Sequence, residues 1–229
     1  MSQDENLNKA RMKAKLTLLS IVSIILFSLG LAVLFGMHPI SNAIYQERAQ
    51  NFKGALETYD KGLENPIFAV DPQIYVARAF CLRRLKRYDE GLASLDKAEE
   101  LRSKYPNIWW MIGTDHSPVQ FRILLERGWN RSSAKEYQEA LKWFDRALAV
   151  QKIDSAYQGR ASCYEQLGDL KKAESEYRRA VDHAASCTLE RANHEMGSFY
   201  RRQRRYDEAL KWFDKAQAIE ACAGVNREK

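Results

Sequence analysis

The chain has 229 residues, a formal net charge of +6 and 45% hydrophobic residues. Most Lys and Arg residues alternate with Glu and Asp instead of forming a basic stripe with stacking aromatics, which argues against nucleic acid as a partner. The four cysteines are too widely spaced for the disulfide framework of a small secreted protein.

The N-terminal region divides into a basic tail, residues 1–15, and an apolar segment, residues 16–36. From Leu16 to Phe35 the chain has no charge, Pro, Asn or Gln over 20 residues, which matches the roughly 20 that a membrane-spanning helix needs. The apolar core of a signal peptide is shorter, about 7–15 residues, so we predict a retained transmembrane helix.

The flanks of this segment predict its orientation. Basic residues precede it, whereas Met37 to Gln46 contains no Lys or Arg. The positive-inside rule then keeps the N-terminus cytoplasmic and places the following domain on the opposite side, which favours a bacterial inner membrane with periplasmic repeats. A cytosolic domain on a mitochondrial outer membrane is the alternative. Ser28, Ala32 and Gly36 have the spacing of a packing stripe for a second transmembrane helix, although such stripes also occur without a partner.

A pattern of small, large and small residues recurs five times after the apolar segment. Each copy has Ala or Gly, which we call the anchor, then an aromatic residue or Leu four positions later, and Ala or Gly three further on. The copies are Ala55/Tyr59/Gly62, Gly91/Leu95/Ala98, Ala140/Phe144/Ala147, Ala173/Tyr177/Ala180 and Ala209/Phe213/Ala216. The three positions share one helix face. The anchors are 36, 49, 33 and 36 residues apart, and a period in the thirties is typical of helical repeats.

This pattern resembles the second helix of the tetratricopeptide repeat, A-x3-F-x2-A, and the resemblance covers most of residues 40–222. It implies an all-α fold in which the transmembrane helix is followed by a right-handed helical solenoid of about five helix pairs, over residues 37–229. Repeat three departs most from the family, because it keeps Gly128 but has Arg131 where the later aromatic residue of the first helix belongs.

In this family the first helices of successive repeats line a groove that holds a peptide or a partner's helix. The resemblance therefore implies partner-binding residues at the groove positions counted from each anchor. They are Val76, Phe80, Arg83, Arg122, Leu125, Trp129, Gln158, Ser162, Arg191, His194, Ser198 and Arg201. Glu165 occupies a further groove position. Five arginines suit acidic or phosphorylated partner segments through paired hydrogen bonds, unless they point to solvent: Arg83, Arg84, Arg191, Arg201 and Arg202.

The long spacing between the second and third anchors predicts an insertion at about residues 103–118. Trp109, Trp110, Met111 and Ile112 form an apolar run within it. Water disfavours such a run, so it either folds back onto repeats two and three or contacts a partner or the membrane. Aromatic residues are enriched at interface hot spots, which makes Trp109 and Trp110 candidate partner contacts.

The sequence contains no pattern that predicts catalysis or a cofactor. It has neither a Gly-rich phosphate loop nor a G-x-S-x-G elbow. His183 and Cys187 are spaced i, i+4, but only His194 is available as a further ligand, so we predict no metal site. Cys81 and Cys163 hold equivalent helix positions, and we expect both thiols to fill the core.

These features predict a non-enzymatic, membrane-anchored scaffold that binds other proteins through its groove and the Trp109/Trp110 loop. The favoured form is a subunit or assembly factor of a membrane protein complex. A chaperone or translocation receptor that binds client peptides, and a regulator of an envelope enzyme, are the alternatives. Repeat architecture alone does not choose between them.

Overall fold

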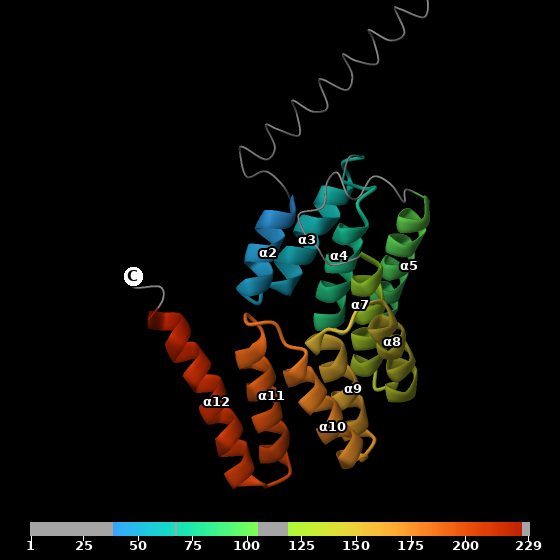
Figure 1. The fold of residues 1–229 in the computed structure, drawn as a ribbon. Coiled ribbons are helices and arrows are strands. Elements are labelled where there is room, and N and C mark those ends of the chain that lie inside the picture. Colours follow the sequence, from blue (N-terminus) through green and yellow to red (C-terminus); the bar gives the residue numbers. More distant parts are fainter. Residues whose placement is uncertain (1–38, 67, 105–118, 226–229) are drawn as a thin grey trace, which may run out of the picture. The chain divides into compact units, whose positions relative to one another are not determined.

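The computed structural model describes residues 39–66, 68–104 and 119–225 of the chain. Within these ranges all regular structure is helical, and no strand is present (Figure 1). The ten helices are α2 Pro39–Arg48, α3 Phe52–Leu63, α4 Pro72–Arg84, α5 Tyr88–Lys104, α7 Val119–Ser133, α8 Tyr137–Val150, α9 Asp154–Gln166, α10 Leu170–Asp182, α11 Leu189–Arg202 and α12 Tyr206–Val225. For the described residues, the predicted all-α fold of about five helix pairs is confirmed.

The chain divides into two compact units, Met1–Gly62 and Leu63–Lys229. In the described part of the first unit, the Tyr59 hydroxyl on α3 donates to Glu47 Oε1 on α2 at 2.9 Å. The second unit contains four helix pairs, α4–α5, α7–α8, α9–α10 and α11–α12, and each pair packs against the next. Neighbouring repeats therefore supply each other's apolar contacts, as in other repeat proteins.

A three-residue turn joins the two helices of every pair. Its middle residue has a positive φ each time: Gln50 58°, Lys86 61°, Lys135 66°, Gly168 83° and Arg204 60°. In the α4–α5 turn, the Lys86 N–H donates to Arg83 O at 3.0 Å and the Arg87 N–H donates to Leu82 O at 2.9 Å. Equivalent bonds close the other four turns. This is the Schellman arrangement, in which a left-handed residue lets the last helical carbonyls find donors.

The left-handed residue always precedes the anchor of its repeat by five positions. The turn thereby fixes where the second helix starts and which of its faces meets the first helix. Glycine adopts this conformation without steric cost, whereas other residues lose roughly 1–2 kcal/mol. Only Gly168 among the five uses glycine, so four turns hold a strained residue that the surrounding hydrogen bonds keep in place.

The core depends on close approach between aromatic rings and helix backbones. Phe144 on α8 is fully buried. A Cβ atom added at Gly128 on α7 would lie 2.6 Å from its ring, and one added at Gly159 on α9 would lie 2.4 Å from it. The ring therefore fills the space between its own first helix and the first helix of the next repeat. Gly197 and Phe213 make the same kind of contact between α11 and α12.

The anchor positions are buried throughout the described repeats, as the pattern predicts. Ala55, Gly91, Ala140, Ala173 and Ala209 all lie in the interior. The expectation that the two equivalent cysteines fill the core is also confirmed, because Cys81 and Cys163 are buried.

Helix α5 continues as a regular helix through Lys104, at the start of the predicted insertion at about residues 103–118. Helix α7 then starts at Val119. Trp109 and Trp110 lie outside the described residues, so their predicted partner contact stays a prediction.

The predicted transmembrane segment, residues 16–36 with the stripe Ser28, Ala32 and Gly36, also lies outside the described residues. None of the helices in the described ranges combines the length and apolar character needed to cross a membrane.

We expect Lys135→Gly to raise the free energy of unfolding by about 0.5 kcal/mol, because relief of left-handed strain outweighs the greater chain entropy of glycine. The matched control is Lys142→Gly on the exposed face of α8, where glycine costs about 1 kcal/mol. Gly168→Ala, which places a Cβ at φ 83°, should also destabilise. Urea unfolding followed by circular dichroism measures all three. Equal destabilisation by both lysine substitutions would contradict the proposed role of the turn.

Gly159→Ala should lower the free energy of unfolding by about 1–3 kcal/mol, since its new methyl group collides with the buried Phe144 ring. Alanine is otherwise the better helix former, by about 1 kcal/mol, so the sign of the effect is diagnostic. A double-mutant cycle with Phe144→Leu tests the contact. The alanine should cost less when the smaller side chain faces it. If the two changes in the free energy of unfolding are strictly additive, Gly159 does not contact the Phe144 ring.

Candidate functional site

The first helices of repeats three, four and five, α7, α9 and α11, border a cleft of about 440 Å³. Tyr177 reaches the same cleft from α10, the second helix of repeat four. The lining residues are Trp129, Gln158, Ser162, Glu165, Gln166, Tyr177, Glu195 and Arg202. Three successive repeats thus contribute side chains to one site, all within the second unit.

An ion pair with two hydrogen bonds lies in this cleft. Arg202 Nε and Nη2 donate to the two carboxylate oxygens of Glu165 at 2.7 and 2.9 Å. The Tyr177 hydroxyl donates to the same carboxylate at 3.2 Å. Burial raises the pKa of Tyr177, and the charge of Glu165 raises this pKa further. The phenol therefore stays protonated, and the network links α9, α10 and α11 as a charge-balanced unit.

The cleft also presents polar groups that can bind a ligand. Gln158 Nε2 is buried, and no acceptor for it occurs within the described residues. Ser162 lies one helical turn further along α9. Trp129 is held by edge-on packing against Phe144, with ring centroids 5.2 Å apart. An aromatic wall beside a side-chain amide and a hydroxyl suits a polypeptide main chain, whose carbonyl groups require donors.

The predicted groove residues only partly come together. Trp129, Gln158 and Ser162 all line the cleft. Leu125 instead packs beside the buried clusters around Phe121 and Phe144. The remaining predicted residues, which do not line this cleft, are Val76, Phe80, Arg83, Arg122, Arg191, His194, Ser198 and Arg201.

Two of the predicted groove positions need correction. Val76 is buried among Ala79, Leu95 and Ile123, because this face of α4 packs against α5 and α7. Ser198 is also buried. Neither side chain is accessible to a partner in this structure. The family positions did not distinguish a residue at the groove from one that faces the neighbouring helix.

Three of the arginines considered for acidic partners already bind carboxylates of the chain. Arg83 pairs with Glu126 at 3.1 Å, and both side chains are largely buried. Arg191 pairs with Asp154 at 3.2 Å, and Arg202 pairs with Glu165 as described above. An acidic segment would have to displace these partners, which disfavours the phosphate-binding or acidic-peptide interpretation.

The other predicted polar residues have local contacts. Arg122 Nη1 donates to Gln73 Oε1 at 3.2 Å. His194 packs against Phe213, with ring centroids 5.2 Å apart. The Arg201 guanidinium lies 5.9 Å from the centre of the same Phe213 ring. The Arg83 guanidinium lies 5.1 Å from the centre of the Phe80 ring.

Sequence reasoning treated Tyr177 only as a core aromatic and missed its hydroxyl. A signal was present, because Tyr59 and Tyr177 each have a glutamate twelve residues earlier, Glu47 and Glu165, and both pairs form a hydrogen bond. The repeats with Phe have no glutamate at that position. Gln166 and Glu195 were also missed.

A second hollow, of about 360 Å³, lies where the start of α5 meets the end of α7. Its lining includes Asn130, whose side-chain amide is buried and has no hydrogen-bond partner within the described residues. The equivalent position in repeats two and four is occupied by the buried thiols Cys81 and Cys163. Repeat three thus places a polar group where its neighbours place a small apolar one, which costs stability.

No cluster of three or more His, Cys, Asp or Glu side chains that could hold a metal ion occurs within the part of the chain that the structure describes. His183, considered as a ligand with Cys187, packs its ring against Tyr157 at a centroid distance of 4.7 Å.

Stacked helix pairs with a cleft along their first helices define the class of helical-repeat proteins. Comparison with known families then identifies tetratricopeptide repeats at residues 41–106, 154–186 and 193–220. The chain therefore contains tetratricopeptide repeats. These matches do not include residues 107–153, where repeat three departs from the pattern. No curated protein matches the chain.

Solved structures share this fold at low sequence identity. A thermophilic tetratricopeptide protein of Thermus thermophilus is 17% identical, with a TM-score of 0.63, over 80% of this chain and 90% of that one. A Rap protein complexed with competence and sporulation factor is 18% identical, with a TM-score of 0.66, over 79% and 52%. MamA from Desulfovibrio magneticus RS-1 is 19% identical, with a TM-score of 0.51, over 80% and 94%.

We expect Asn130→Cys to raise the free energy of unfolding by about 1–2 kcal/mol, because it removes a buried amide without partners. The reciprocal substitution Cys163→Asn should lower it by about 1–3 kcal/mol. Urea unfolding of both variants provides the comparison. Destabilisation by Asn130→Cys would mean that the amide is satisfied in solution, for instance by a buried water.

Proposed function

We propose that the protein is a non-enzymatic scaffold that binds a segment of a partner protein in the cleft between α7, α9 and α11. The observation that carries this proposal is the convergence of Trp129, Gln158 and Ser162 from two successive repeats on one cleft. Their side chains offer an aromatic surface, an amide and a hydroxyl. These groups bind a peptide chain and do not form a catalytic set.

The charges of the cleft restrict the partner. Glu165 is neutralised by Arg202, and Glu195 adds a further carboxylate to the lining. A segment with a neutral or basic side chain near Glu195 is therefore favoured over an acidic one. The cleft volume of about 440 Å³ accommodates a few residues, so a short extended segment or one face of a partner helix is the expected ligand.

Relatives of the same fold support a role in protein binding. The Rap structure is that of a complex with competence and sporulation factor, and we extend the binding of a partner to this chain as part of the proposal.

We further propose that residues 16–36 anchor the scaffold in a membrane, with the repeats on the side opposite the N-terminus. The support comes from the uncharged run Leu16 to Phe35 and the basic residues before it, which match the length and charge rules for a membrane span. An anchored binding domain fits a subunit or assembly factor of a membrane complex, and the stripe Ser28, Ala32 and Gly36 suits a partner helix within the bilayer.

The cleft is tested by affinity purification of the tagged full chain from gently solubilised native membranes. Quantitative mass spectrometry then compares wild type with Glu195→Lys and with Ser162→Trp, which fills the cleft. A stoichiometric partner should be recovered with wild type. Its recovery should fall at least about tenfold with both variants, which corresponds to a loss of about 1.4 kcal/mol in binding free energy.

The matched control is Lys142→Glu, which changes an exposed charge on α8 away from the cleft and should leave recovery unchanged. Circular dichroism confirms that the variants fold. Full recovery of the partner with Ser162→Trp would place binding elsewhere, and the absence of any stoichiometric partner from wild type would contradict the scaffold itself.

A further inference from the structure

Two second helices of the chain share seven identical residues but have different neighbours. Glu139 to Asp145 on α8 and Glu208 to Asp214 on α12 both read EALKWFD. Helix α8 packs between α7 and α9, whereas α12 packs mainly on α11 at the end of the second unit (Figure 1). The same surface is therefore covered in one place and open in the other.

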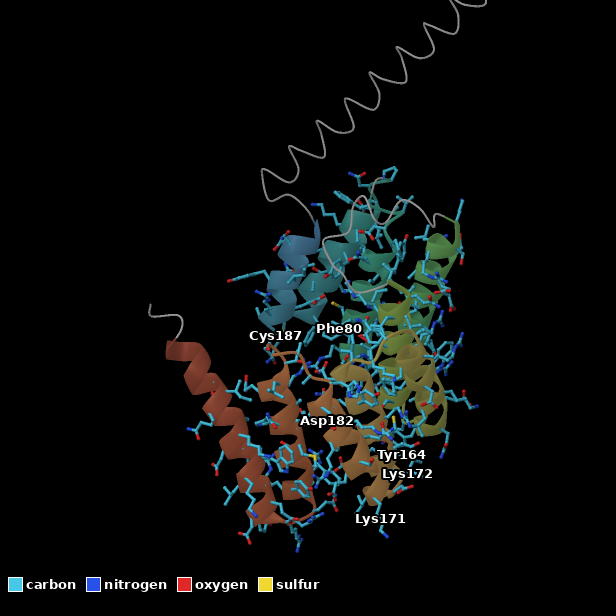
Figure 2. All side chains as sticks on the ribbon, in the orientation of Figure 1. Phe80, Tyr164, Lys171, Lys172, Asp182 and Cys187 are labelled. Carbon is cyan, nitrogen blue, oxygen red and sulfur yellow. The ribbon has the colours of Figure 1, made fainter. Side chains whose placement is uncertain are left out.

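The leucine of this shared sequence shows the difference. Leu141 is 9% exposed, because it packs in a cluster with Phe144 and Cys163, with Tyr164 of α9 against it. Figure 2 shows Tyr164 beside Lys172, whose Nζ lies 5.3 Å from the ring centre. The equivalent Leu210 on α12 is 59% exposed. Tyr206, which corresponds to Tyr137, is exposed as well.

The contact of α9 on α8 has two sides, and the first repeat exposes the side that corresponds to α9. The position ten residues before the anchor faces the preceding repeat, as Cys163 does towards Leu141. At this position Cys81, Asn130, Cys163 and Phe199 are at most 1% exposed. In repeat one the residue is Tyr45 on α2, and it is 74% exposed. Ile44 beside it is also exposed.

We propose that a second copy of the chain binds head to tail, with α2 of one copy docked on α12 of the next. The contact of α9 on α8 supplies the register. Gly159, Arg160 and Cys163 of α9 correspond in α2 to Ser41, Asn42 and Tyr45, counted from their anchors. All three α2 side chains are exposed, so each is accessible to a second copy.

Two of the three α2 side chains, Asn42 and Tyr45, have a complementary position on α12. Ser41 is small but carries a Cβ atom, for which Gly159 has no room against Phe144, so α2 approaches Phe213 less closely than α9 approaches Phe144. Asn42 can donate to Asp214, in place of the ion pair between Arg160 and Asp145 at 3.2 Å. Tyr45 covers Leu210. The apolar and polar features thus agree in a single register.

This interface is heterologous, because two different surfaces meet. A heterologous interface forms an open filament unless the rotation between successive copies closes the assembly into a ring. A second copy is the occupant that the chain specifies best, since it carries both surfaces and already uses the same kind of contact between its own repeats. The inference does not depend on the proposed cleft, which lies on α7, α9 and α11.

Sedimentation velocity of the purified full chain in detergent, over a roughly hundredfold concentration range, tests the proposal. Wild type should form larger species as concentration rises. Leu210→Lys removes the α12 surface and Tyr45→Lys removes the α2 surface, so each variant alone should remain monomeric. Because each retains the other surface, an equimolar mixture should give a one-to-one complex that does not grow further.

The control Lys142→Glu, on the exposed face of α8, should associate like wild type. Unchanged circular dichroism and melting temperature establish that the exposed substitutions leave the fold intact. A monomeric wild type at every concentration overturns the proposal. Association of Tyr45→Lys alone would show pairing through α12, and persistent association of both variants would place the contact elsewhere, including the predicted transmembrane segment. Either result also overturns it.

Discussion

The contact on which the second unit depends is that of a buried aromatic ring with the backbones of two glycine-containing helices. Phe144 lies so close to Gly128 and Gly159 that neither position has room for a Cβ atom. The ring therefore sets both the spacing within repeat three and the spacing to repeat four. Dispersion and apolar burial are strongest when surfaces meet without voids. The small residues thus contribute to packing because they leave room for the ring. The repeat pattern alternates small and large positions for this reason.

The turns within the helix pairs align the first helices that border the cleft. Each one holds a left-handed residue five positions before its anchor, closed by the same two backbone hydrogen bonds. Identical turns give each pair the same hand and the same register, so the first helices of successive repeats bring corresponding faces together. The cleft is a consequence of that repetition, and the Glu165–Arg202 pair then ties α9 to α11 across it. Fold and site are therefore linked through backbone geometry at residues that never touch the cleft.

Periodic residues could be predicted from the sequence, whereas non-periodic contacts could not. The anchors and their aromatic partners were placed correctly because a helix face follows from spacing alone. The resemblance to the repeat family predicted Trp129, Gln158 and Ser162 as groove residues, and all three line the cleft. It failed for Val76, because one helix has two inner faces and the pattern does not state which one meets a neighbour. It could not reveal that Arg83 and Arg191 are paired, since Glu126 and Asp154 lie 43 and 37 residues away in sequence.

Residues that depart from the repeat pattern are candidates for function, because packing does not account for them. A position that packs in every repeat is constrained by its neighbours. A polar side chain without partners at such a position lowers stability and adds no packing contact. Asn130 is of this kind. Tyr45 and Leu210 are another departure, because the position of Tyr45 is buried in the four later repeats, and the residues equivalent to Leu210 in repeats one and three, Leu56 and Leu141, are buried. Exposing them is unfavourable unless something covers them in solution. A repeat protein solves this with a polar terminal surface or with a partner, and the apolar character of both positions favours the partner.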